Sequence, residues 1–174
     1  MSGKIIGIVI MISALIAGAA LYYLQIYGFY EEVDAPAEGV TMISLAGLAE
    51  PIPTDSFEAI DADSSPIRYR ACFTTPYSLA LMSETFQLIE DATPRNAPGW
   101  FDCFDAADIA AELDAGTALS FLGAKNVHFG VDRIVAVTED GRGYVWHELN
   151  ECGEKAYDGT IVGEECPDRP ASQD

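Results

Sequence analysis

Residues 133–147 have the sequence RIVAVTEDGRGYVWH. Two runs rich in β-branched and aromatic residues, 133–137 and 143–147, flank Asp140-Gly141-Arg142. Asp-Gly between such runs is a strong hairpin signal, because glycine accepts the positive φ of a tight turn. The stretch therefore predicts two adjacent antiparallel strands.

Weaker strand signals precede this hairpin. Residues 67–73 alternate between apolar and other side chains, as a half-buried strand does. Residues 118–122 and 127–129 are short apolar candidates.

Two helices are predicted before the hairpin. The first begins at Pro76 with Thr75 as its cap and ends before Pro94. Its apolar residues recur at helical spacing and are Leu79, Met82, Phe86 and Ile89. The second is capped by Asp105 and stopped by Gly116. The predicted fold class is α+β, an antiparallel sheet with about two packed helices.

A 26-residue uncharged run, Ile5 to Tyr30, lies far upstream. A bilayer core of about 30 Å needs about 20 apolar residues, so the run predicts a single transmembrane helix. Aromatic side chains favour the headgroup level, and an interface belt is expected at the C-terminal end of the run. Its tyrosines are Tyr22, Tyr23, Tyr27 and Tyr30.

The orientation and processing of this helix are expectations. Lys4 and the terminal amine favour a cytoplasmic N-terminus. Ala17-Gly18-Ala19 also matches a signal-peptidase site. Because the apolar run continues to Tyr27, an uncleaved anchor is favoured over a signal peptide.

Small residues share one side of the predicted helix. They are Gly7, Ala14 and Gly18, with Ala17 beside them. Such a stripe lets another helix approach closely and predicts a packing face, although small residues are also common in membrane helices generally.

The remainder of the chain is strongly acidic. All 28 Asp and Glu but only eight of the nine Lys and Arg follow the helix, which gives this part a formal charge of −20. Nucleic acid is therefore an unexpected partner, whereas a basic c-type cytochrome would be attracted. An acidic surface that serves only solubility is the alternative.

Four cysteines lie beyond the helix: Cys72, Cys103, Cys152 and Cys166. An even count outside the cytoplasm suggests two disulfides, and four cysteines allow three pairings. The local order favours Cys72–Cys103 and Cys152–Cys166. No pair has C-x-x-C spacing, which makes zinc an improbable use.

The chain is predicted to divide into four parts. Residues 1–30 form the anchor, 31–40 an acidic linker, 41–166 the α+β domain and 167–174 a disordered tail.

No residue set specifies a reaction. His128 and His147 are the only histidines, and they could meet across the sheet, but structural hydrogen bonding is the favoured interpretation. Trp100 and Trp146 are expected to be core or rim aromatics. No catalytic, cofactor-binding or metal-ligating residue is therefore predicted, and the chain is expected not to be an enzyme.

Three sequence blocks carry a resemblance: residues 60–73, 97–105 and 140–147, together with Tyr22-Tyr23-Leu24-Gln25 at the helix end. They resemble a family of small uncharacterised single-pass membrane proteins of alphaproteobacteria with a disulfide-containing periplasmic domain. The resemblance implies a bacterial inner membrane and a periplasmic domain, but it transfers no site residues.

Two functions follow as expectations. The first is a non-enzymatic accessory subunit of an energy-converting complex, such as a photosynthetic reaction-centre and light-harvesting core or a respiratory oxidase. The alternative is a membrane-anchored periplasmic assembly or redox factor that acts on copper or thiols.

Overall fold

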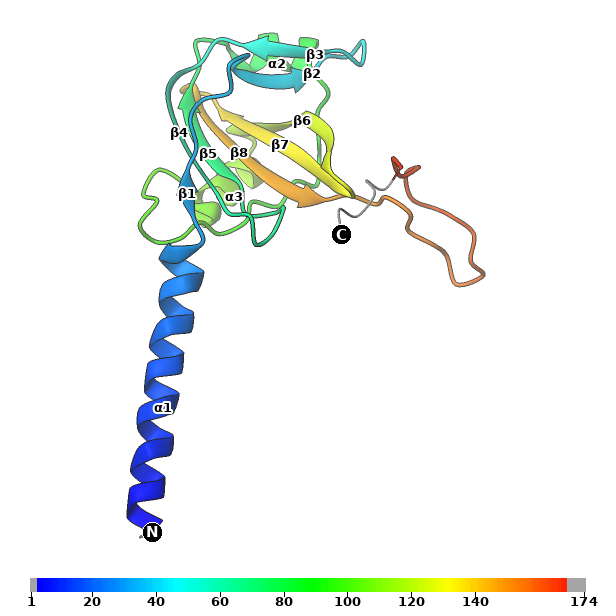
Figure 1. Cartoon of the computed structure of the whole chain (residues 1–174). Helices are drawn as coiled ribbons and strands as arrows, with labels where there is room; N and C mark the ends of the chain where they lie inside the picture. Colours follow the sequence, from blue (N-terminus) through cyan, green and yellow to red (C-terminus); the bar gives the residue numbers. More distant parts are fainter. Residues whose placement is uncertain (1–2, 169–174) are drawn as a thin grey trace.

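The computed structural model describes residues 3–168, in which a long helix projects from an α+β domain (Figure 1). Helix α1 (Gly3–Tyr23) continues into a π-helical turn, η1 (Leu24–Gly28). Most of the predicted tail, residues 169–174, lies outside the described residues.

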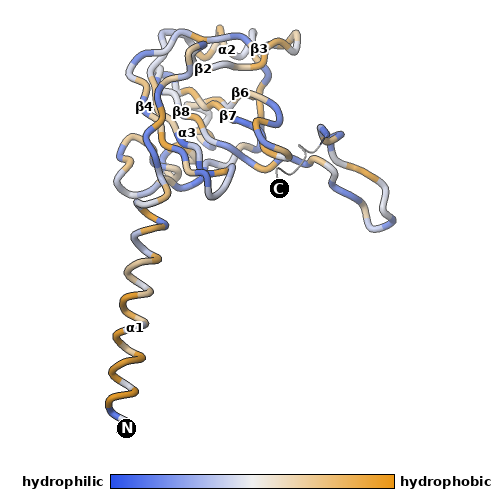
Figure 2. Tube along the Cα trace, viewed as in Figure 1, coloured by the Kyte–Doolittle hydropathy of each residue, from blue (hydrophilic) through white to orange (hydrophobic). Residues whose placement is uncertain are grey.

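The projecting helix is hydrophobic along most of its length (Figure 2) and buries none of its residues against the domain. Within residues 3–168 it is the one helix long and apolar enough to cross a membrane, spanning Gly3–Gly28. The N-terminal helix therefore indicates a membrane anchor.

A six-stranded antiparallel sheet forms the centre of the domain. In spatial order its strands are β1 (Glu31–Glu32), β4 (Asp55–Asp61), β5 (Arg70–Thr74), β8 (Arg142–Leu149), β7 (Val131–Thr138) and β6 (Ala118–His128). The predicted hairpin is β7–β8, and Gly141 in its turn has a φ of 84°.

Both faces of this sheet are covered. Val135, Val137 and Val145 pack on one face, against α2 (Leu79–Thr85) and a separate hairpin of β2 (Val40–Ile43) and β3 (Ala49–Ile52). On the other face, Ile134 and Trp146 pack against α3 (Ala106–Ala115) and the loop before it. The side chains of β7 and β8 thus alternate between two hydrophobic cores. The fold is α+β, as predicted, and it has three layers.

The predicted first helix is wrong at both ends. Thr75 does not cap it: Ser78 does, and its hydroxyl accepts a hydrogen bond from Leu81 N. The helix ends at Thr85, and Phe86 is extended, with φ −116° and ψ 158°.

Residues 86–89 instead connect the two sheets. Gln87 N donates to Ile43 O, and Gln87 O accepts from Leu122 N, both at 2.9 Å. These bonds satisfy open edges of β2 and β6, so tertiary pairing overrides the helical spacing of Phe86 and Ile89.

The strand predictions were incomplete. Residues 118–122, Val127 and His128 belong to one long strand, β6, which contains bulges rather than a break, whereas Phe129 lies in the turn that follows. The strand expected at 67–73 begins only at Arg70. Strands β1 to β4 had no clear sequence signal.

The second helix forms as predicted. Asp105 Oδ1 accepts hydrogen bonds from Ala107 N at 2.8 Å and Asp108 N at 3.2 Å. Gly116 ends the helix in the left-handed conformation, with φ 74°.

Two disulfides form, with the pairing expected from the local order: Cys72–Cys103 and Cys152–Cys166. The first joins β5 to the loop before α3. The second closes residues 152–166, which extend away from the sheet (Figure 1). Disulfides fit an oxidising compartment outside the cytoplasm.

The two disulfides should differ in their effect on the domain. Replacing Cys72 and Cys103 by alanine should lower the free energy of unfolding by about 3–4 kcal/mol, because this bridge closes a long loop within the core. Replacing Cys152 and Cys166 should lower it by less than about 1 kcal/mol, because residues 150–166 lie outside the core. Urea unfolding followed by tryptophan fluorescence measures both, and equal losses would contradict this assignment.

Candidate functional site

The junction between the membrane helix and the domain is held by specific hydrogen bonds and aromatic contacts. A helix leaves its last carbonyl groups without backbone partners, and they require other donors. Phe29 N donates to Leu24 O at 3.2 Å, and Tyr30 N donates to Tyr27 O at 3.3 Å.

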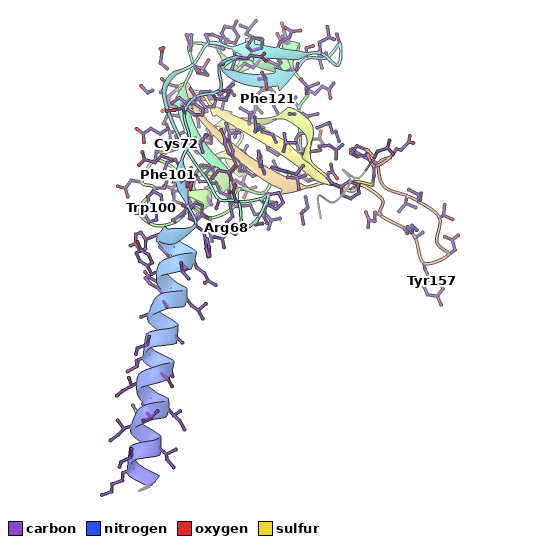
Figure 3. The ribbon with its side chains drawn as sticks, viewed as in Figure 1. Arg68, Cys72, Trp100, Phe101, Phe121 and Tyr157 are labelled. Atoms are coloured by element: carbon purple, nitrogen blue, oxygen red, sulfur yellow. A yellow bond between two sulfur atoms is a disulfide. The ribbon has the colours of Figure 1, made fainter. Side chains whose placement is uncertain are left out.

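The carbonyls of Gln25 and Ile26, which lie between Leu24 and Tyr27, accept hydrogen bonds from the domain. Trp100 Nε1 donates to Ile26 O at 2.6 Å, and Arg68 Nη1 reaches Gln25 O at 3.5 Å. Figure 3 shows both side chains at the domain end of the helix. The carbonyl groups of residues 24–27 therefore all have donors, and two of those donors attach the helix to distant loops.

Aromatic packing surrounds these hydrogen bonds. Trp100 stacks on Tyr27 with ring centroids 6.3 Å apart and meets Tyr30 edge-on at 6.1 Å. The guanidinium of Arg68 lies 5.4 Å from the centre of the Tyr30 ring, within cation–π range. We call Arg68, Trp100, Tyr27 and Tyr30 the junction cluster.

The predicted interface tyrosines thus divide into two pairs. Tyr22 and Tyr23 are exposed on the helix, as an interfacial belt requires. Tyr27 and Tyr30 also bind the domain through the junction cluster. Trp100, expected to be a core or rim aromatic, instead binds the helix end, and its position after Pro98-Gly99 in a loop is the one signal of this role in the sequence.

A buried arginine supports the loop that carries Trp100. Arg70 Nε donates to Arg95 O at 2.7 Å and Nη2 to Asn96 O at 3.2 Å. Nη1 donates to the carbonyls of Ile67 and Tyr69. Burial lowers the pKa of Arg70 to about 10, and the four carbonyls take the place of water around its charge.

Beside the junction lies an acidic groove of about 430 Å³. It is lined by residues 32–35, residues 57–60 of β4 and residues 100–103. Four of these carry carboxylates: Glu32, Asp34, Glu58 and Asp102. The groove therefore favours cations close to the membrane end of the domain.

Residues 31–40, expected to be a linker, begin on the sheet. Glu31 and Glu32 pair with Asp61 and Ile60 of β4, and Val33 N donates to Ala59 O at 2.9 Å. This pairing extends the attachment of the helix from the junction cluster into the sheet.

The predicted packing stripe makes no contact that the structure shows. Gly7, Ala14, Ala17 and Gly18 are exposed, and a Cβ at either glycine would meet nothing within 4 Å. The stripe is free to receive another helix, and its role stays a prediction.

The two histidines meet, with ring centroids 6.1 Å apart. His147 is 2% exposed and stacks on Tyr69 at 4.8 Å. Its Nδ1 lies 2.8 Å from Pro66 O, while Arg133 Nε donates to its Nε2 at 3.1 Å. Both ring nitrogens are therefore engaged in a neutral imidazole with the proton on Nδ1.

These contacts give His147 a structural role rather than a metal-binding one. A metal at His147 Nε2 would have to displace the Arg133 guanidinium, and within residues 3–168 no three His, Cys, Asp or Glu are grouped to hold a metal. The bond to Pro66 O instead holds the turn that leads to Arg68 of the junction cluster.

The fold and the junction define a class: a membrane-anchored α+β protein whose disulfide-bonded domain is attached to its helix by side chains. The chain belongs to DUF6446, a family of unknown function, whose model matches residues 40–167. No curated protein and no solved structure matches the chain. The match assigns no activity or source, so the alphaproteobacterial resemblance stays an expectation.

The stability of the domain should depend on His147 at mildly acidic pH. Burial, reinforced by Arg133 and His128, lowers its pKa from 6.5 to about 4. The unfolded chain binds a proton below pH 6.5 and the folded one does not, so stability falls as the pH drops from about 6.5 to about 4. The loss is up to about 3 kcal/mol, at about 1.4 kcal/mol per unit of pKa difference.

The change is measured as the free energy of unfolding in urea across this pH range. Because the many carboxylates titrate in the same range, the informative quantity is the difference between the wild type and His147→Gln. The variant should have the flatter profile. Parallel profiles would show that His147 is protonated equally in both states.

Proposed function

We propose that this protein is a non-enzymatic accessory subunit of a larger inner-membrane complex, held with its N-terminus in the cytoplasm and its domain in the periplasm. The observation that carries the proposal is the junction cluster. Because Trp100 and Arg68 bind the helix end directly, docking of the helix to a partner also sets the position of the domain.

The orientation is supported by two independent features. Lys4 precedes the helix, which favours a cytoplasmic N-terminus. Both disulfides lie on the far side, where an oxidising periplasm would preserve them.

The acidic groove supports a role beside a basic partner. Trp100 of the junction cluster lines this groove together with the four carboxylates, so the groove adjoins the membrane end of the domain. Such a field would concentrate a basic c-type cytochrome where a membrane complex exchanges electrons. Charge and the family resemblance thus both favour an energy-converting complex, either photosynthetic or respiratory.

The alternative of a copper or thiol factor has less support. It needs a reactive thiol or an available imidazole. All four cysteines form disulfides, and both nitrogens of His147 are engaged. Rapid thiol labelling of the unreduced native protein would favour this alternative over the accessory role.

The helix stripe provides the test. Replacing Gly7 and Gly18 together by leucine should reduce co-purification of a partner by about tenfold or more, because leucine prevents close helix approach. A C-terminal tag, mild detergent and mass spectrometry measure this. The matched control replaces Ala19 and Ala20 by leucine, which adds comparable bulk away from the stripe at 100° per residue.

Both variants should retain a folded domain, monitored by tryptophan fluorescence. Equal co-purification of both variants and the wild type would remove the stripe from the proposal. Recovery of the wild type only as a free monomer, from its native membranes, would contradict the accessory role itself.

A further inference from the structure

The disulfide-closed segment after β8 exposes apolar side chains without an evident structural reason. We call residues 150–166 the arm. At its tip Tyr157 is fully exposed, and along one strand Ile161 and Val162 are 62% and 61% exposed. Neighbouring exposed apolar residues of this size usually mark a contact with a partner or a membrane.

The arm is internally ordered. Ala156 N donates to Thr160 O at 2.8 Å and Val162 N to Glu154 O at 2.9 Å, which gives a narrow hairpin closed by Cys152–Cys166. Its exposed apolar side chains are therefore presented by a hydrogen-bonded backbone rather than by a loose tail.

Polar contacts fix the base of the arm to the sheet. Lys125 of β6 pairs with Glu164 of the arm and, at 3.1 Å, with Asp132 of β7. Asn150 Nδ2 donates to the same Asp132 carboxylate at 2.7 Å. The direction of the arm is therefore set relative to the sheet.

The arm points toward the membrane side of the molecule. Figure 3 shows Tyr157 far to one side of α1 but roughly level with its domain end, and Figure 1 shows the β2–β3 hairpin at the opposite end of the domain. Because the junction cluster fixes the helix to the domain, the depth of the tip relative to the membrane is fixed as well.

We infer that the arm rests on the surface of the same membrane that α1 spans, with Tyr157, Ile161 and Val162 at headgroup level. Tyrosine has the amphipathic ring that this level favours. The exposed apolar side chains of the arm thus contact lipid. The anchor and the arm make two separate contacts with one bilayer.

The charges of the arm determine how deep its tip lies in the membrane and which lipid headgroups it favours. Asp158 neighbours Tyr157 at the tip, and its carboxylate accepts a hydrogen bond from Thr160 N at 3.0 Å. A charged carboxylate there keeps the tip out of the hydrocarbon. Five acidic residues against one lysine favour zwitterionic over anionic headgroups; the acidic residues are Glu151, Glu154, Asp158, Glu164 and Glu165.

The test uses the full chain in phosphatidylcholine nanodiscs whose acyl chains are brominated near the headgroup. Bromine quenches tryptophan that approaches it. The emission added by Tyr157→Trp should be quenched at least about twofold relative to unbrominated discs, as an interfacial indole would be. The matched control is Leu48→Trp, an exposed site in the β2–β3 hairpin, whose added emission should not change.

A second variant distinguishes binding of the arm to lipid from a chance approach of the introduced tryptophan to the disc. Adding Ile161→Asp to Tyr157→Trp should abolish the extra quenching, while the domain, which the arm lies outside, stays folded. Equal quenching of Tyr157→Trp and Leu48→Trp would overturn the inference. The discs contain no partner protein, so this outcome would leave the proposed accessory role to its own co-purification test.

Discussion

The hydrogen bond from the Trp100 indole to the Ile26 carbonyl is the contact on which the arrangement of this protein depends. It satisfies a carbonyl that the end of a helix would otherwise leave open, and it does so with a side chain 74 residues away in sequence. Without it and its partner from Arg68, the helix and the domain would be joined only by the chain itself and the short pairing of β1. With them, a membrane anchor becomes one body with the domain.

Several buried features converge on that contact. Arg70 donates hydrogen bonds to the carbonyls of Ile67 and Tyr69, on either side of Arg68 in the chain, and to those of Arg95 and Asn96 in the Trp100 loop. Cys103 binds the same loop to β5. Arg70 and the Cys72–Cys103 disulfide thus hold the loops that contact the helix end, and the loop that carries Trp100 and Cys103 also lines the acidic groove.

The sequence predicts those parts whose signals are local. Asp140-Gly141 specifies a turn, Asp105 and Gly116 specify the ends of a helix, and the short spacing of Cys152 and Cys166 suggests their pairing. It fails where distant partners decide the structure. Phe86 and Ile89 have helical spacing, yet the open edges of β2 and β6 draw residues 86–89 into an extended conformation. Trp100 looks like any loop aromatic until the helix end is placed beside it.

The contacts of the junction cluster imply that the helix and the domain move as one rigid body. This rigidity is tested by pulsed electron paramagnetic resonance in nanodiscs, with spin-labelled non-natural residues at Ser13 of α1 and Leu48 of the β2–β3 hairpin, so that the native disulfides remain undisturbed. We expect a single narrow distance distribution for the wild type and a broad one for Trp100→Ala. A distribution equally broad in both proteins would show that the domain swings on a flexible tether, and would contradict the account.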